Sequence, residues 1–310
     1  MNVLLIRADE TKAWRSALRR HLPEADVYVW GEDDVDKADI DYACVWKPEP
    51  GLLATFPNLK GIYNLGAGVD ALLQDETLPR DVPLVRLVDP MLSSGMVEYV
   101  VHGVLHFHRD MHFYAGQQKA KNWTQHLNAN TQKRGVGILG LGELGQDCAH
   151  ALLMLGFENI AGWSRTEKEL PGIQSFAGED GLNQFLQHSE ILVNLLPATK
   201  ATHRLLNRDT LSKLPKGAFV INAGRGTTVN DDDLIETLNN GQVAAAMLDV
   251  FNTEPLPQDH PYWSMNNLIL TPHIASLTTP MTAAEIITKG LRDLEDGNTP
   301  DNLVDIEQGY

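Results

Sequence analysis

The 310-residue sequence has little of what marks a disulfide-rich, membrane or secreted protein. Its two cysteines, Cys44 and Cys148, stand far apart and form no CxxC pair, so we expect no disulfide framework. Its longest apolar runs, such as Val3–Ile6 and Val243–Leu248, are much shorter than the roughly 18 residues of a membrane helix. The first residues reach a charge at Arg7 without a long apolar segment, so we expect no signal peptide. These absences predict a cytoplasmic protein with reduced thiols.

Basic residues are also scarce. Lys and Arg number 25 against 41 Asp and Glu, which gives a formal charge of −16. This charge repels nucleic acid and anionic membranes, so we predict neither as a partner. It still allows a small anionic ligand in a locally basic pocket. The hydrophobic content of 43% is ordinary for a globular protein, and the length favours about two domains.

Strand-like runs alternate with helix-like runs, which predicts an α/β fold with parallel sheets. The first part of the chain predicts a helix over Thr11–Leu22 and strands over Val3–Arg7, Val27–Trp30, Tyr42–Trp46, Gly61–Asn64 and Leu84–Val88. A long helix is expected over Ser93–Tyr114, followed by a polar surface arm over Gln117–Arg134. The later strands are expected at Val136–Leu139, Asn159–Trp163, Ile191–Leu196, Ala218–Asn222, Val243–Val250 and Leu268–Leu270. The later helices are expected at Gly145–Leu155, Gly181–His188, Asp231–Leu238 and Ala283–Leu294, before a short strand-like tail at Asn302–Ile306.

A glycine loop follows the strand Val136–Leu139 and opens the next helix. Its glycines, Gly140, Gly142 and Gly145, form a GxGxxG pattern. In this context the first glycine allows a tight turn, the second a close approach of a pyrophosphate, and the third close packing of helix on strand. The helix N-terminus then offers N–H groups to the phosphates. We predict a dinucleotide site; a plain turn between strand and helix is the alternative.

The end of the following strand indicates which dinucleotide is bound. NAD sites usually place an acidic residue there, whereas this chain has Ser164, Arg165 and Thr166. An arginine suits a 2′-phosphate through its charge and its bidentate geometry. We therefore predict NADPH rather than NADH. The alternative is that Arg165 is a solvated loop charge.

Three more segments follow strand ends, and they carry Arg225, Glu254 and His273. In an open α/β sheet, ligands bind outside the carboxyl ends of the strands, so these side chains could converge. Reduction of a 2-ketoacid needs this combination. An arginine stabilises charge on the carbonyl oxygen, a protonated histidine supplies a proton, and a glutamate orients the histidine. Taken singly, an Arg–Glu surface pair and a structural histidine are the alternatives.

With these motifs the sequence resembles the D-isomer-specific 2-hydroxyacid dehydrogenases over nearly all of its length. The motifs that carry the resemblance are Gly140–Gly145, Asn222–Gly226, Leu248–Pro255 and Thr271–Ser276. The resemblance implies that Arg225 binds the substrate carboxylate and carbonyl, that Glu254 partners His273, and that His273 is the acid/base. It also implies further cofactor-binding residues, namely Leu141, Glu143, Leu144, Leu196, Pro197, Ala223, Gly224, Asp249 and His273. The usual His-Leu-Pro stretch reads Leu195-Leu-Pro197, so a histidine common near the cofactor is absent.

Within that family the sequence is most similar to the glyoxylate/hydroxypyruvate reductase A group. The shared segments are Asp41–Trp46, Leu65–Asp70, Trp163–Arg165, Ser175–Gly178 and the ending Gly309-Tyr310. This resemblance implies that the loop of Gly66, Ala67 and Gly68 binds the substrate carboxylate through backbone N–H groups. It also implies that Trp46 helps to close the pocket; a core aromatic at a strand end is the alternative.

The function we predict is NADPH-dependent reduction of glyoxylate to glycolate and of hydroxypyruvate to D-glycerate. A reductase of larger 2-ketoacids and a dinucleotide-sensing binding protein are the alternatives. We expect two Rossmann-like domains with a cleft between them: residues 1–95 plus 285–310 for substrate, and residues 96–284 for the dinucleotide. The resemblance implies a homodimer, with the helix Ser93–Tyr114 as interface candidate. That helix carries His102, His106, His108 and His112, but we predict no metal site because no third ligand is evident and hydride transfer needs none.

Overall fold

The computed structural model describes residues 1–127 and 129–306, and the chain divides into two compact units. Unit 1 comprises Met1–Leu92 and Leu277–Tyr310, and unit 2 comprises Ser93–Ser276. The chain therefore leaves unit 1 three residues before the expected boundary at 95 and returns to it eight residues before residue 285. The early return has a visible anchor, since the Thr278 hydroxyl already donates a hydrogen bond to the Leu65 carbonyl of unit 1 at 3.0 Å.

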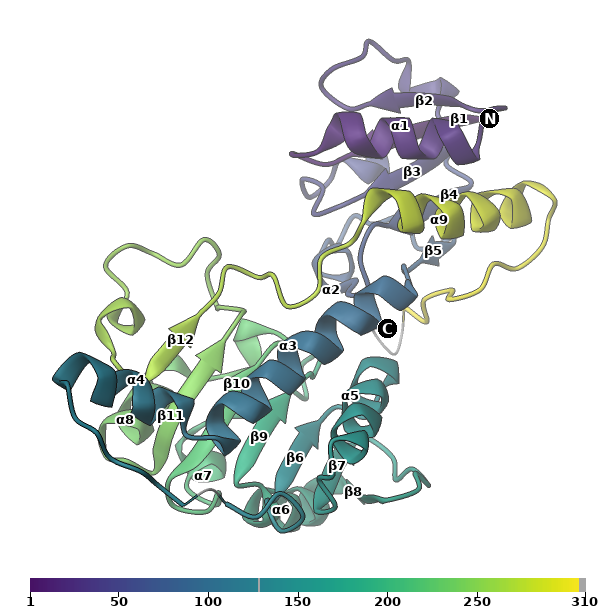
Figure 1. The fold of residues 1–310 in the computed structure, drawn as a ribbon. Helices are drawn as coiled ribbons and strands as arrows, with labels where there is room; N and C mark the ends of the chain where they lie inside the picture. The colour runs from purple at the N-terminus through teal and green to yellow at the C-terminus, as the bar shows by residue number, and fades with distance from the viewer. Residues whose placement is uncertain (128, 307–310) are drawn as a thin grey trace. The chain divides into compact units, whose positions relative to one another are not determined.

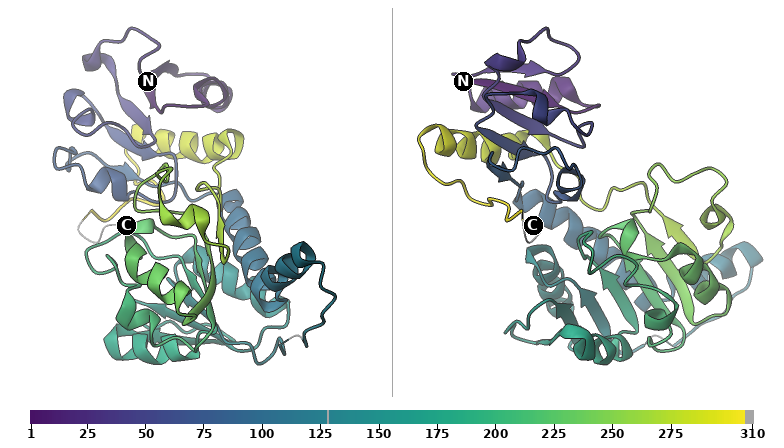
Figure 2. Two further views of the ribbon diagram at one scale, coloured as in Figure 1. Left: turned by 90° about the vertical axis from the view of Figure 1, so that its left-hand side faces the viewer. Right: turned by 180° about the vertical axis from the view of Figure 1, so that it is seen from behind.

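Unit 1 is built on a parallel sheet. Within the described residues this sheet has five strands in the order β2-β1-β3-β4-β5, with bounds Asn2–Ile6 (β1), Asp26–Val29 (β2), Tyr42–Val45 (β3), Gly61–Asn64 (β4) and Leu84–Val85 (β5). Helices α1 (Thr11–His21) and α9 (Pro280–Glu295) lie side by side against one face (Figure 2). They bury Leu18 and Ile287 against Leu5 because side chains along a strand alternate between the two faces. Helix α2 (Asp70–Leu73) and the 3₁₀ turns Lys37–Asp39 and Leu53–Thr55 lie on the side of the other face.

The prediction that the tail Asn302–Ile306 is a strand is wrong. This tail forms an isolated antiparallel bridge between Leu303 and Val85 and does not extend the sheet. Asn302 has a left-handed backbone with φ of 64°, which turns the chain where a strand would need extended residues. The tail does return to unit 1, because the Val304 N–H donates to the Leu84 carbonyl at 2.8 Å.

Unit 2 has a larger parallel sheet. In the described part of the chain its order is β12-β11-β10-β9-β6-β7-β8, with bounds Val136–Leu139 (β6), Ile160–Ser164 (β7), Ile173–Ala177 (β8), Ile191–Asn194 (β9), Ala218–Asn222 (β10), Val243–Leu248 (β11) and Leu268–Leu270 (β12). The helices are α3 (Pro90–His108), α4 (Met111–Ala120), α5 (Glu143–Met154), α6 (Gly178–His188), α7 (Arg208–Leu211) and α8 (Asp231–Asn239), with 3₁₀ turns at Gly226–Thr228 and Pro261–Ser264. All neighbouring strands pair in parallel, so their carboxyl ends share one edge (Figure 1).

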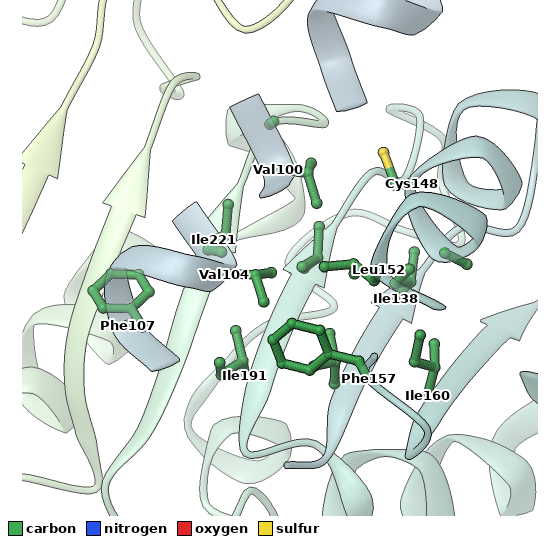
Figure 3. Close-up of a cluster of buried hydrophobic side chains, with 14 of the residues drawn as sticks. Val100, Val104, Phe107, Ile138, Cys148, Leu152, Phe157, Ile160, Ile191 and Ile221 are labelled. Carbon is green, nitrogen blue, oxygen red and sulfur yellow. The ribbon is translucent and has the colours of Figure 1, made fainter. Parts of the chain in front are cut away.

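Two hydrophobic layers flank this sheet. Helices α3 and α5 cover one face, where Val104 and Leu152 meet strand residues such as Ile138 (Figure 3). Helices α6, α7 and α8 cover the other face and meet strand residues such as Leu192. Helix α3 packs closely because it carries Gly103, whose Cβ would lie 2.9 Å from the Ile221 side chain. The sheet and α3 thus form a fixed base for the loops at the carboxyl edge.

The single helix expected over Ser93–Tyr114 is wrong. It is two helices, α3 and α4, because Asp110 adopts a left-handed backbone with φ of 54° and ends the first helix. The apolar spacing continues across this break, so the pattern did not reveal it. Strand β8 and the short helices α2 and α7 are absent from the prediction as well. Across the described ranges, no helix is both long and apolar enough to cross a membrane.

Candidate active site

The glycine loop of unit 2 joins β6 to α5. Gly140 has φ of 100°, and its N–H donates to the Trp163 carbonyl of β7 at 2.8 Å. A Cβ at position 145 would lie 1.9 Å from the Gly140 carbonyl oxygen, so this position requires glycine. Around a Cβ built at Gly142, in contrast, no described atom beyond its immediate surroundings lies within 4 Å. The loop therefore has a tight turn, a tightly packed helix and an open middle position in front of a helix N-terminus.

Ser164 ends β7, and Arg165 and Thr166 follow it in the loop; all three lie at the same edge as the glycine loop, because β6 and β7 are paired parallel neighbours. The Ser164 hydroxyl donates to the Thr166 carbonyl at 2.8 Å and closes a short turn. The Lys168 N–H donates to the Ser175 hydroxyl of β8 at 2.9 Å. Arg165 is exposed on this fixed turn. The arrangement therefore offers a cation at the same edge of the sheet as the glycine loop.

The loops after β9 and β10 contact each other and the glycine loop. A Cβ at Gly224 would lie 2.7 Å from the Leu196 carbonyl oxygen, and one at Gly140 would lie 3.1 Å from the Leu195 carbonyl oxygen. Backbone therefore approaches backbone at both points. The predicted cofactor-binding residues Leu196, Pro197, Ala223 and Gly224 accordingly belong to loops that adjoin Gly140. Their contact with a cofactor stays a prediction.

Arg225 sits on a loop that buried amide side chains hold in place. The Asn222 side chain accepts a hydrogen bond from the Asn194 amide at 2.9 Å and donates to the Arg225 carbonyl at 3.3 Å. The Thr228 hydroxyl donates to the same carbonyl at 2.6 Å. A Cβ at Gly226 would lie 2.0 Å from the Phe251 carbonyl carbon, so this loop also lies directly against the loop that leads to Glu254. These contacts fix the backbone that carries the guanidinium.

Glu254 and His273 form the central pair of the site. The imidazole Nδ1 of His273 lies 2.8 Å from Oε2 of Glu254, and the second carboxylate oxygen accepts the Phe251 N–H at 3.1 Å. Both side chains are partly exposed, at 33% and 24%. The glutamate thus fixes the ring through Nδ1 and leaves Nε2 as the nitrogen that can exchange a proton with a ligand.

Asp249 lies beneath this pair and is 1% exposed. Its backbone carbonyl accepts the N–H of His273 at 2.8 Å. Its carboxylate accepts the N–H groups of Ile274 and Ala275, both at 2.8 Å, and the hydroxyl of Thr271 at 2.6 Å. His273 itself has a left-handed backbone with φ of 56°, which is uncommon for a residue other than glycine. Asp249 therefore supports the loop that carries His273, while its predicted contact with a cofactor stays a prediction.

In unit 1, a second loop follows β4. The Asn64 side chain donates to the carbonyls of Gly66 and Gly68, both at 2.8 Å, and the Leu87 N–H donates to Gly66 at 3.2 Å. Trp46 packs against this loop so closely that a Cβ at position 66 would lie 2.4 Å from its ring. The indole is partly buried at the edge of the unit 1 core. The structure therefore brings Trp46 to the loop of Gly66, Ala67 and Gly68.

Comparison with known proteins decides the family. Residues 101–275 match the model of the D-isomer specific 2-hydroxyacid dehydrogenase NAD binding domain. The glyoxylate/hydroxypyruvate reductase A of Yersinia enterocolitica is 44% identical over 306 residues, which are 97% of each chain. The protein of the same name from Serratia proteamaculans is 43% identical over 96% of each chain. The chain belongs to the D-isomer specific 2-hydroxyacid dehydrogenase family.

Solved structures of this family share the fold. A D-isomer specific 2-hydroxyacid dehydrogenase from Xanthobacter autotrophicus in complex with NADPH and MES has a TM-score of 0.94 at 42% identity, and the match covers 99% of each chain. The NADPH-dependent glyoxylate/hydroxypyruvate reductase of Sinorhizobium meliloti in complex with NADP and sulfate has a TM-score of 0.93 at 33% identity. That match covers 100% of this chain and 99% of the other. The expected α/β class with parallel sheets is confirmed, and the family's NAD binding domain falls within unit 2.

Several residues that support the site did not emerge from the sequence. Asn194 and Thr228 hold the Arg225 loop, and Tyr99 and Thr271 form hydrogen bonds beneath the His273 loop. Their roles depend on contacts between distant segments. Thr271 opens the motif Thr271–Ser276, but no local motif marks Asn194, Thr228 or Tyr99. Among the described residues, no group of three or more His, Cys, Asp or Glu side chains could hold a metal ion, and this includes the histidines of α3 and α4.

Proposed function

We propose that the chain is an NADPH-dependent reductase of small 2-ketoacids that converts glyoxylate into glycolate and hydroxypyruvate into D-glycerate. The observation that carries this proposal is the 2.8 Å contact between His273 and Glu254 at the strand edge that also carries Arg225 and the glycine loop. The names of the Yersinia and Serratia relatives support the choice of substrates. The NADPH and NADP complexes of the structural relatives support the choice of cofactor.

The residues of unit 2 fit the proton and charge requirements of ketone reduction. Arg225 would bind the substrate carboxylate and stabilise the charge that develops on the carbonyl oxygen. His273 would deliver a proton from Nε2 to that oxygen, and Glu254 would hold the ring through Nδ1. NADPH, when bound, supplies the hydride. The substrate then gains one hydride at carbon and one proton at oxygen, which gives the 2-hydroxyacid.

The residues around the glycine loop fit a dinucleotide. The open space at Gly142 suits the close approach of a pyrophosphate. The N-terminus of α5, a helix of 12 residues, directs backbone N–H groups and the positive end of the helix dipole toward such an anion. Arg165 would bind the 2′-phosphate of NADPH, because its fixed turn follows β7, where NAD sites carry a carboxylate. In unit 1, we propose that the loop of Gly66, Ala67 and Gly68 binds the substrate carboxylate and that Trp46 limits substrate size.

Initial rates would test the proposal directly. The oxidation of NADPH and of NADH should be followed in parallel by their loss of absorbance, with glyoxylate or hydroxypyruvate as the substrate. Fast turnover with NADPH and slow turnover with NADH are expected. Equal turnover with both cofactors would contradict the proposed role of Arg165 but would still support the reductase activity. If NADPH binds but neither acid is reduced, the larger 2-ketoacids phenylpyruvate and 2-ketoisocaproate should be tested. Turnover of these acids would favour a broader 2-ketoacid reductase, and no turnover would favour a dinucleotide-sensing protein.

We also infer that the protein is a cytoplasmic homodimer that uses α4 and the arm after it, residues 121–127 and 129–134. Helix α4 buries none of its side chains, and Trp123 and Leu127 on the arm are 97% and 99% exposed. Two large apolar side chains that are so fully exposed and stand four residues apart on one arm favour a surface for another protein. Cys44 and Cys148 are free and buried thiols, which fits a reducing compartment.

A further inference from the structure

Beneath the His273 loop, a chain of hydrogen bonds connects helix α3 to the carboxylate of Asp249. The Tyr99 hydroxyl lies 2.7 Å from the Thr271 hydroxyl, and the Thr271 hydroxyl donates to Asp249 Oδ1 at 2.6 Å. A threonine hydroxyl has one proton, and a carboxylate can only accept. Because Thr271 gives its proton to Asp249, Tyr99 must be the donor to Thr271. The direction of the chain is therefore fixed: Tyr99 donates to Thr271, and Thr271 donates to Asp249.

The rest of Asp249 holds the loop that carries the acid/base. Three successive N–H groups, those of His273, Ile274 and Ala275, donate to its backbone carbonyl and its two carboxylate oxygens at 2.8 Å each. These bonds hold His273 in its left-handed backbone, which few non-glycine residues adopt without such support. A rotation of the Asp249 carboxylate would disturb two of the three bonds. The Thr271 hydroxyl is the side-chain contact that resists this rotation.

Tyr99 comes from a rigid element. Helix α3 approaches the loop at Gly95, where a Cβ would lie 3.5 Å from the Ala275 carbonyl, and it packs on the sheet at Gly103, where a Cβ would lie 2.9 Å from Ile221. Tyr99 lies one turn from each of these contacts, so its position is set on both sides. Burial, with a smaller contribution from the charge of Asp249, raises the pKa of Tyr99, so the phenol keeps the proton that it donates.

We propose that Tyr99 is a positioning residue for the reaction: through Thr271 and Asp249 it fixes the loop that aims the His273 imidazole. The proposal rests on the proposed function, since it assigns His273 as the proton donor. The Tyr99 hydroxyl forms its hydrogen bond with Thr271, so we expect its effect on His273 to pass through Thr271.

Tyr99→Phe tests the proposal because it removes the hydroxyl and keeps the ring. We expect kcat for hydroxypyruvate to fall about 5- to 30-fold, since small displacements of a reacting group have effects of this order. The KM for hydroxypyruvate and the dissociation constant of NADPH should stay within about twofold. Tyr114→Phe is the matched control, because its hydroxyl accepts the His126 N–H away from this loop. An unchanged kcat in Tyr99→Phe, or an equal fall in the control, would overturn the proposal.

Variants of Thr271 separate positioning from general stability. Thr271→Val should lower kcat at least as much as Tyr99→Phe, whereas Thr271→Ser should restore it to within about threefold of the parent. In the Thr271→Val background, Tyr99→Phe should have less than a twofold effect, because the link is already broken. Fully multiplicative losses in the double variant would mean that Tyr99 acts by another route, and would overturn the proposal.

Hydrogen–deuterium exchange gives a readout that does not depend on turnover. Tyr99→Phe should speed exchange of the N–H groups of residues 273–275, while a peptide from β6 keeps its rate. Unchanged exchange at 273–275 would overturn the proposal even if kcat fell. If the parent protein reduces no 2-ketoacid, the proposed function fails, and the exchange experiment still decides whether Tyr99 fixes the loop.

Discussion

The imidazole Nδ1 of His273 and Oε2 of Glu254 lie 2.8 Å apart, although the two residues follow different strands of unit 2. The loop after β11 supplies the carboxylate, and the loop after β12 supplies the ring. Since β11 and β12 are paired parallel neighbours, their carboxyl ends bring these loops together. The contact fixes Nδ1 of His273 and leaves Nε2 for the proton transfer that we propose.

Replacing His273 with Ala should lower kcat by about 10²- to 10⁴-fold, the range that a positioned acid or base contributes. Glu254→Gln should have a smaller effect, about 10- to 100-fold, because the ring remains while its charged partner is lost. NADPH binding, measured by fluorescence titration, should stay nearly unchanged in both. His203→Ala, at an exposed histidine, is the control. Parent-like turnover of His273→Ala would remove this residue from the mechanism.

Replacing Arg165 with Ala should raise the KM for NADPH by about 10- to 100-fold, because a charge-assisted hydrogen bond contributes roughly 1.5–3 kcal/mol. The KM for NADH should stay within about twofold, since NADH has no 2′-phosphate. Arg208→Ala is a matched control, because Arg208 of α7 pairs with Asp233 and Glu236 of α8. Equal weakening of both cofactors would show that Arg165 does not read the 2′-phosphate.

Continuous apolar runs made much of the fold predictable. The bounds of β4, β6, β10 and β12 agree to the residue with the sequence prediction, because these strands are short apolar runs that end at polar or turn-forming residues. Strand β8 was missed because Gln174 and Ser175 interrupt its apolar residues, so it forms no continuous apolar run. Its alternation of polar and apolar residues is correspondingly weak.

The site, like the fold, was predictable only in part from the sequence. Arg225, Glu254, His273 and the glycine loop stand in local motifs at strand ends, so the sequence alone could nominate them. The support beneath them could not be found this way: Tyr99 and Thr271 are 172 positions apart, and their contact exists only after α3 has packed on the sheet. The break between α3 and α4 could not be predicted either. The left-handed backbone of Asp110 separates the two helices, while the apolar spacing of the sequence continues across it.

Gly66→Ala should impair substrate binding without affecting the cofactor. The new methyl group would lie 2.4 Å from the Trp46 ring, so the indole or the loop must move. We expect the KM for hydroxypyruvate to rise at least about fivefold and the melting temperature to fall by a few degrees, as overpacking typically destabilises by 1–3 kcal/mol. Gly116→Ala, where a Cβ on α4 would meet open space, should change neither quantity. A parent-like KM for Gly66→Ala would contradict the proposed role of this loop.

The double substitution Trp123→Ser and Leu127→Ser should convert the inferred dimer into a monomer. Both side chains are almost fully exposed on the arm, and their removal takes away a large apolar contact area at little expense to the fold of unit 2. Sedimentation velocity would measure the change. Met154→Ser, at a residue that is 90% exposed on α5, is the control and should leave the assembly unchanged. A parent protein that sediments as a monomer would contradict the dimer itself.

Acid should destabilise unit 2 through the histidines of α3 and α4. Burial lowers the pKa of His106, and the nearby His102 and His112 lower it further; burial also lowers the pKa of His112, against an opposing effect of Asp110. Among the described residues, His106 Nε2 and His112 Nδ1 have no hydrogen-bond partner. The folded protein therefore binds these protons less readily than the unfolded chain, whose histidines titrate near pH 6.5.

The sign of the effect follows from this difference. The stability is fully present above about pH 6.5 and is lost as the pH falls from there toward the lowered pKa values of the folded state. Each titrating histidine contributes a slope of at most ~1.4 kcal/mol per pH unit to the free energy of unfolding. Urea unfolding of His106→Leu between pH 7.5 and 5.0 should show a shallower slope than the parent protein, while His203→Leu, at an exposed position, should keep the parent slope. Identical slopes in all three proteins would show that His106 takes up its proton as readily in the folded chain as in the unfolded one.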